Sequence, residues 1–93
     1  MRFSFDATKS LANKEKHGID FVEAQELWRD EHCVLLPARS ASEDRDMLIA
    51  EWHEKKWTAI ITERGTTIRL ISVRRSRKHE EEFYEKRRIA RSL

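Results

Sequence analysis

The amino-acid sequence predicts an α+β fold in which two N-terminal helices and a C-terminal helix pack on an antiparallel β-sheet. Residues 6–28 carry apolar side chains at helical spacing on either side of a glycine that suits a helix end. Residues 45–73 contain three apolar runs joined by short turns, which is typical of neighbouring antiparallel strands. Residues 77–90 form a charged segment behind a serine that can cap a closing helix.

The length and composition indicate one domain, spanning residues 1–93. Hydrophobic and charged residues each make up 39% of the chain, so a modest core lies under a strongly polar surface. The single cysteine, Cys33, cannot form an internal disulfide, which favours a reducing compartment. No apolar run reaches the ~20 residues that a membrane span requires, and the first ten residues lack the core of a signal peptide. We therefore expect a cytoplasmic protein without membrane association.

The N-terminal segment is expected to begin with a short edge strand at residues 3–5, where phenylalanines alternate with a polar residue. Asp6 or Thr8 can then cap a first helix. This helix should end at His17, because Gly18 adopts the left-handed conformation that terminates helices at low cost.

A second helix is expected directly afterwards, so that the two form a helical hairpin. Asp20 and Glu23 stand at capping-box spacing, with Asp in place of the usual Ser or Thr. The residues that share its apolar face are Phe21, Ala24, Leu27 and Trp28.

The remaining chain is expected to supply four strands and the last helix. Residues 33–36 form an outer strand that Pro37 ends, and residues 38–44 form a loop. Strands then follow at 45–53, 57–63 and 66–73. The last two carry apolar residues on both faces, which indicates a sheet covered by the helical hairpin on one side and partly by the final helix on the other. On the last strand we expect Arg69 to share a face with Ile71 and Val73.

Basic residues gather around the final hairpin and the start of the closing helix. Residues 1–73 carry 11 basic and 13 acidic side chains, whereas residues 74–91 carry eight and four. Cations in the first turn of a helix oppose the helix dipole, and such local conflicts concentrate at functional sites. We predict a phosphate-binding surface there. Its members are Arg64, Arg69, Arg74, Arg75, Arg77 and Lys78.

Two alternatives bear on this prediction. The arginines can instead pair with acidic residues 80–82 or with Asp44 and Asp46, as ordinary surface ion pairs of low energy. Tyr84 is expected to reach solvent and offer its hydroxyl near a phosphate. The other large aromatic side chains are expected in the core, namely Trp52, Trp57 and Phe83.

The sequence offers no metal site and no cofactor motif. Its four histidines and one cysteine lack metal-ligand spacing, and only two glycines are present. Cleavage of RNA needs neither a metal nor a cofactor, because the 2′-hydroxyl of the substrate is the nucleophile. The protein has only to supply cations and a proton acceptor. His17, which follows Lys14 and Lys16 at the end of the first helix, is a candidate proton acceptor. The alternative is a histidine that only interacts with the helix dipole.

Two separated segments resemble the BrnT family of bacterial toxins. The first is KHGIDFVEA at residues 16–24. The second comprises Thr62, Arg64, Arg69, Ile71, Ser72, Arg74, Arg75, Glu80 and Tyr84. The resemblance covers nearly the whole chain. It implies a fold similar to RelE-type ribonuclease toxins, an endoribonuclease that halts growth, and a BrnA-type antitoxin with a ribbon-helix-helix domain that brings the complex to operator DNA.

The resemblance also implies site residues. Arg64, Arg74 and Arg75 would bind and stabilise the scissile phosphate, His17 or Glu80 would move the proton, and Lys14 is a further catalytic candidate. The RNA-binding candidates around them are Lys16, Arg69, Arg77, Lys78 and Tyr84. The alternative function is a basic module that binds nucleic acid or a DNA-binding partner in transcriptional repression without cleaving RNA, since phosphate contacts alone say nothing about chemistry.

Overall fold

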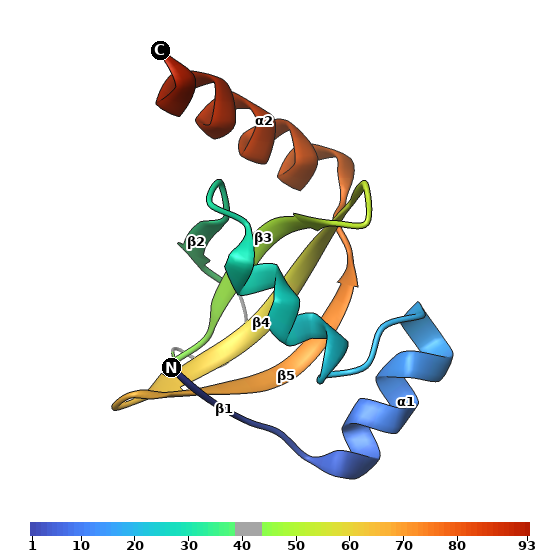
Figure 1. Ribbon diagram of the computed structural model, residues 1–93. Helices are drawn as coiled ribbons and strands as arrows, with labels where there is room; N and C mark the ends of the chain where they lie inside the picture. Colours follow the sequence, from blue (N-terminus) through green and yellow to red (C-terminus); the bar gives the residue numbers. More distant parts are fainter. Residues whose placement is uncertain (39–43) are drawn as a thin grey trace.

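A five-stranded sheet with the strand order β1-β5-β4-β3-β2 organises the protein (Figure 1). The computed structural model describes residues 1–38 and 44–93. The elements in chain order are β1 (Arg2–Ser4), α1 (Ala7–His17), the 3-10 helix η1 (Glu23–Arg29), β2 (Val34–Pro37), β3 (Asp46–Trp52), β4 (Lys55–Arg64), β5 (Thr67–Arg75) and α2 (Lys78–Ser92). The predicted α+β class and order of elements are confirmed, while most of the expected 38–44 loop lies outside the described residues.

The sheet is mixed, and the expectation of a wholly antiparallel sheet is wrong at one edge. Strands β2 to β5 pair antiparallel in sequence order, as the short turns predict. Strand β1 instead runs parallel to β5, with Phe3 opposite Ile68. The two strands are distant in the chain, so no hairpin turn fixes their relative direction.

A β-bulge in β5 changes which side chains share a face. Ile60 pairs with Ser72 and Ile61 with Leu70, so that Ile71 has no partner across the ladder. Beyond this extra residue Val73 lies on the same face as Leu70, and both belong to the buried core. The expectation that Val73 shares a face with Arg69 is therefore wrong.

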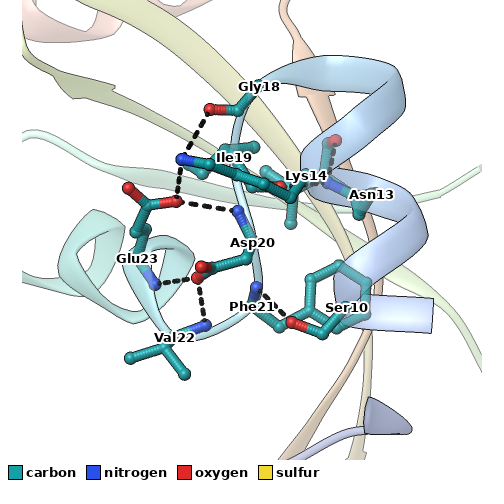
Figure 2. Close-up of polar contacts among 10 residues, drawn as sticks. Ser10, Asn13, Lys14, Gly18, Ile19, Asp20, Phe21, Val22 and Glu23 are labelled. Carbon is teal, nitrogen blue, oxygen red and sulfur yellow. Dashed lines mark hydrogen bonds and ion pairs between the residues drawn. The ribbon is translucent and has the colours of Figure 1, made fainter. Parts of the chain in front are cut away.

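Local capping signals in the N-terminal half are confirmed. The Asp6 side chain accepts a hydrogen bond from the Lys9 N–H, and Gly18 ends α1 with a φ of 82°. Asp20 and Glu23 form the reciprocal capping box, with N···O distances of 3.0 and 2.7 Å (Figure 2). The helix that follows is a 3-10 helix of seven residues and not an α-helix, which is longer than most helices of that geometry.

The main core lies between one face of the sheet and residues 19–29, which cross that face in Figure 1. From this segment Ile19, Phe21, Ala24 and Leu27 are fully buried. Helix α1 takes little part, because its buried residues are Ser10 and Asn13, while Leu11 is 72% exposed. The expected helical hairpin thus covers the sheet only through its second half.

Polar contacts fix α1 beside β5. The Asn13 amide nitrogen donates to the carbonyl oxygens of Ile19 and Val73 at 2.7 and 2.8 Å, and its oxygen accepts from the Val73 N–H at 3.1 Å. The Ser10 hydroxyl accepts from the Phe21 N–H (Figure 2). These side chains satisfy backbone groups that would otherwise be buried without partners.

Helix α2 covers part of the second face. Tyr84 is buried there with Val34 and Ile49. Phe83 is 37% exposed, so its expected place in the core is wrong. Arg77, not the expected Ser76, occupies the N-cap position of α2. No helix among the described residues is long and apolar enough to cross a membrane.

Replacing Asn13 tests the attachment of α1. Asn13→Ala leaves the Val73 N–H and C=O buried without partners, at about 1–3 kcal/mol for each group. We expect urea unfolding to show a loss of about 3 kcal/mol in the free energy of unfolding. Leu11→Ala, on the exposed side of the same helix, should change it by less than about 0.5 kcal/mol. Equal stability of the two variants would contradict the role of Asn13.

Candidate active site on the open face of the sheet

The second face of the sheet is only half covered, and two cavities lie on its open part. The sheet-face cavity is lined by Leu36, Pro37, Ala38, Met47, Ile60, Arg74, Arg77, His79 and Glu80. The hairpin-end cavity is lined by Lys9, Asp44, Arg45, Asp46, Thr62, Glu63, Arg64, Arg69 and Ile71. Ile60 and Thr62 alternate along β4 and so point to the same side of the sheet. The two cavities therefore share one face.

An ion pair between Arg74 and Glu80 forms the wall of the sheet-face cavity next to α2. Two parallel bonds join them, from Nη1 to Oε1 at 2.7 Å and from Nη2 to Oε2 at 2.9 Å. Oε1 of Glu80 also accepts from the Thr58 hydroxyl at 3.0 Å and from the Arg77 N–H at 2.8 Å. This bidentate geometry fixes the guanidinium plane of Arg74. The alternative that an arginine pairs with one of the acidic residues 80–82 is thus confirmed for Arg74.

Glu80 is held as a carboxylate. Its side chain is 3% exposed, and burial alone would raise its pKa. The donors around it, foremost the Arg74 guanidinium, outweigh that effect and lower the pKa from 4.5 to about 2. A carboxylate with so low a pKa and four accepted hydrogen bonds is a poor proton acceptor near neutral pH. Its geometry suits it to hold Arg74 in place.

The hairpin-end cavity brings Arg64 and Arg69 together with Lys9 and Arg45. The Arg69 guanidinium makes a long contact of 3.5 Å with the Ser4 hydroxyl. Within residues 1–38 and 44–93, none of these four cations belongs to an ion pair, although three acidic side chains also line the cavity. Arg64 lies opposite Thr67 at the start of β5, roughly 26 Å of strand from Arg75.

Arg75 is separated from the other cations by the sheet itself. It pairs with Trp57, whose ring belongs to the core on the opposite face, and its guanidinium carbon lies 5.5 Å from the ring centroid. Its Nε donates to the Lys56 carbonyl oxygen at 3.3 Å. Of the six cations predicted to form one surface, four therefore line the two cavities of the open face and Arg75 lies on the other face. Lys78 begins α2 as an exposed residue but lines neither cavity on the open face.

The basic residues near His17 also lie elsewhere. Lys14 forms an ion pair of 2.8 Å with Glu23 and contacts the Gly18 carbonyl oxygen, so it fastens the turn after α1 (Figure 2). That partner raises the pKa of Lys14. Lys16 is exposed and His17 half-buried at the end of α1, and neither lines a cavity on the open face. Lys14, Lys16 and His17 therefore do not line the cavity that contains Arg74.

Tyr84 is buried, and the expectation that it reaches solvent is wrong. Its hydroxyl donates to Oδ2 of Asp30 at 2.6 Å, and the same carboxylate accepts from the N–H groups of His32 and Glu51. Burial and the Asp30 charge raise the pKa of Tyr84. This network ties α2 to β3 and to the end of η1, which is a structural role.

His79 is the functional candidate that sequence reasoning did not select. It is exposed in the first turn of α2 and lines the sheet-face cavity with Arg74 and Arg77. The sequence places His79 directly before Glu80 but does not show which way this turn faces. That direction follows from the ion pair of Glu80 with Arg74. Histidine is the side chain best suited to proton transfer near neutral pH.

Two further cavities among the described residues suit an anionic substrate poorly. The cavity between η1, the β3–β4 turn and α2 is lined by four acidic side chains and two arginines, together with His32 and His53. A neighbouring cavity has two acidic side chains and one arginine. In the described parts of the chain, no three His, Cys, Asp or Glu side chains group as a metal site would require.

The protein is thus a small basic α+β domain whose open sheet face carries cations in both cavities and apolar side chains between them. Comparison with protein families gives the particular class. Residues 5–80 match the family described as the ribonuclease toxin BrnT of type II toxin–antitoxin systems. The chain belongs to this family, and it is a ribonuclease toxin that has RNA as substrate and an antitoxin as partner. A search of curated proteins finds no match.

The low pKa of Glu80 predicts acid sensitivity. A carboxyl whose folded pKa lies below its unfolded value stabilises the fold above the unfolded pKa, and this contribution is lost as the pH falls toward the folded pKa. For Glu80 the window runs from pH 4.5 down to about 2, and the contribution is at most about 3 kcal/mol. We expect Glu80→Gln to lose less stability than the wild type across this window in urea unfolding. Glu82→Gln, an exposed carboxyl on the same helix, should follow the wild type, and a parallel loss in all three proteins would refute the assignment.

Proposed function

We propose that the open face of the sheet is the RNA-binding and catalytic surface of this toxin. The observation that supports this most is the placement of Arg64, Arg69 and Arg74 on one face. Arg69 and Arg74 are separated by roughly 15 Å of strand. A single RNA strand laid between the two cavities would meet phosphate-binding cations at both ends.

The floor between the cations suits nucleobases. Leu36, Met47 and Ile60 line the sheet-face cavity, and Ile71 lines the hairpin-end cavity. The flat faces of bases can make dispersion contacts with these aliphatic side chains, while the backbone phosphates stay near the cationic rim. We propose that Arg74 and Arg77 neutralise the scissile phosphate in the sheet-face cavity. Arg64 and Arg69 then bind the RNA strand some nucleotides away.

The chemistry that we propose needs no metal ion. The 2′-hydroxyl of the substrate attacks the adjacent phosphorus, the bond to the 5′ oxygen breaks, and a 2′,3′-cyclic phosphate and a 5′-hydroxyl end result. Arg74 is already fixed by Glu80 before RNA binds. A fixed guanidinium stabilises the additional charge of the transition state without reorganising at the moment of reaction.

The finer identity of the partner also belongs to this proposal. We propose a BrnA-type ribbon-helix-helix antitoxin that carries the complex to operator DNA, a RelE-like toxin fold, and a cytoplasmic site of action. Membership of the BrnT family supports the partner, and the helix-flanked sheet with an open face supports the fold. The DNA contacts would then come from the antitoxin, and the open face would remain dedicated to RNA.

Two arginines on the last helical segment provide a matched test. Arg77 lines the sheet-face cavity, whereas Arg87 is exposed on α2 and lines neither cavity on the open face. Loss of a charged phosphate contact of about 1.5–3 kcal/mol should lower RNA cleavage about 10- to 100-fold in Arg77→Ala. Arg87→Ala should keep wild-type cleavage. The measurement is induction without antitoxin in bacteria, followed by growth and by mapping of RNA ends.

Two results would contradict the proposal. An Arg77→Ala protein as toxic as the wild type would exclude the sheet-face cavity as the site. Equal losses of cleavage in Arg77→Ala and Arg87→Ala would show only a general effect of charge. Arg75→Ala adds a second discrimination. If Arg75 is catalytic, as the sequence predicts, this variant loses toxicity while it still binds antitoxin. If RNA binds only on the open face, the variant stays toxic.

A further inference from the structure

Cleavage at the sheet-face cavity, next to Arg74 and Arg77, needs a nearby group that accepts the proton of the 2′-hydroxyl. Glu80 is buried, and both of its oxygens already accept hydrogen bonds. Lys14 is paired with Glu23. His17 ends a helix that packs beside β5 and lines neither cavity of this face. The two proton-transfer candidates of the sequence, His17 and Glu80, and the further catalytic candidate Lys14 are therefore either engaged in other contacts or distant from this cavity.

We propose that His79 is the catalytic residue that accepts this proton, an inference that rests on the function proposed above. His79 lines the same cavity as Arg74 and Arg77, and its side chain is exposed and accessible to a substrate. Within residues 1–38 and 44–93 no ion pair engages it. It is the one histidine among the lining residues of the two cavities on this face.

The first turn of α2 holds His79 in a fixed relation to the phosphate-binding arginines. Glu80, the next residue, bonds to Arg74 on β5, to the hydroxyl of Thr58 on β4 and to the N–H of Arg77. The Ser76 hydroxyl, just before the helix, contacts the Thr58 hydroxyl at 2.8 Å. These contacts anchor the helix start on two strands. A general base needs this kind of fixed position, because proton transfer requires hydrogen-bond reach to the reacting hydroxyl.

The step balances without a co-reactant. Neutral imidazole takes the 2′-hydroxyl proton while the 2′ oxygen bonds to phosphorus. The bond from phosphorus to the 5′ oxygen breaks, and that oxygen takes a proton from water. The imidazolium then returns its proton to the resulting hydroxide. No atom is added to the RNA, which leaves as a cyclic phosphate and a hydroxyl end.

The test compares histidine variants of purified toxin in a translating cell extract with a reporter mRNA. His79→Ala should slow cleavage by about 10²- to 10⁴-fold, the usual contribution of a general base. Its affinity for an uncleavable 2′-deoxy-substituted oligonucleotide should stay within about threefold of the wild type. Added imidazole should restore part of the rate, which a structural role would not permit. The control is His53→Asn at the β3–β4 turn, which should keep the wild-type rate.

Each other outcome has a defined meaning. Wild-type rates in His79→Ala, a loss confined to His17→Gln, or a loss that follows RNA affinity and resists imidazole would overturn the role of His79. In all three cases the wild type still cleaves, so the ribonuclease function stands. If the wild type yields no 2′,3′-cyclic phosphate ends, the proposed function fails, and the inference fails with it. Thermal unfolding of His79→Ala and His79→Gln shows whether both variants remain folded.

Discussion

The partly buried ion pair of Arg74 with Glu80 is the contact on which the open face of the sheet depends. A carboxylate that is 3% exposed is tolerable only because a guanidinium and two further donors surround it. The same contacts fix the start of α2 on β4 and β5. The position of Arg77, the direction of the first helical turn and the shape of the sheet-face cavity all follow from this pair. Removal of either partner would leave an uncompensated charge, so stability and site geometry are linked at this point.

The β-bulge at Ile71 decides how the cations are distributed. Before the bulge Arg69 faces the open side, and the extra residue lets Leu70 and Val73 both enter the core. Arg74 then returns to the open side, and Arg75 stacks over Trp57 on the other. Without the bulge, strict alternation would place Arg74 and Arg69 on opposite faces. One unpaired residue thus places two distant arginines on the same surface.

Local chemistry made much of the fold predictable from the sequence. The Asp6 cap, the Gly18 helix end, the Asp20–Glu23 capping box and the short turns between the later strands act over a few residues, and each is confirmed. The parallel pairing of β1 and the burial of Tyr84 depend on contacts between distant segments, which no local pattern encodes. For the site, the sequence selected a group of cations, and their role in binding RNA stays a prediction. It could not assign them to faces or select His79, because both depend on the bulge and on the partner of Glu80.

The two edges of the sheet have a consequence for the free toxin. Exposed strand edges invite pairing with another chain, and proteins prevent this with short strands, proline or a covering side chain. Strand β2 is four residues long and closes on Pro37, and β1 has three residues. Beyond β1, the buried backbone N–H and C=O of Val73 pair with the Asn13 side chain. Few backbone groups at the two edges are thus free to pair with another chain, which lowers the tendency toward edge-to-edge aggregation.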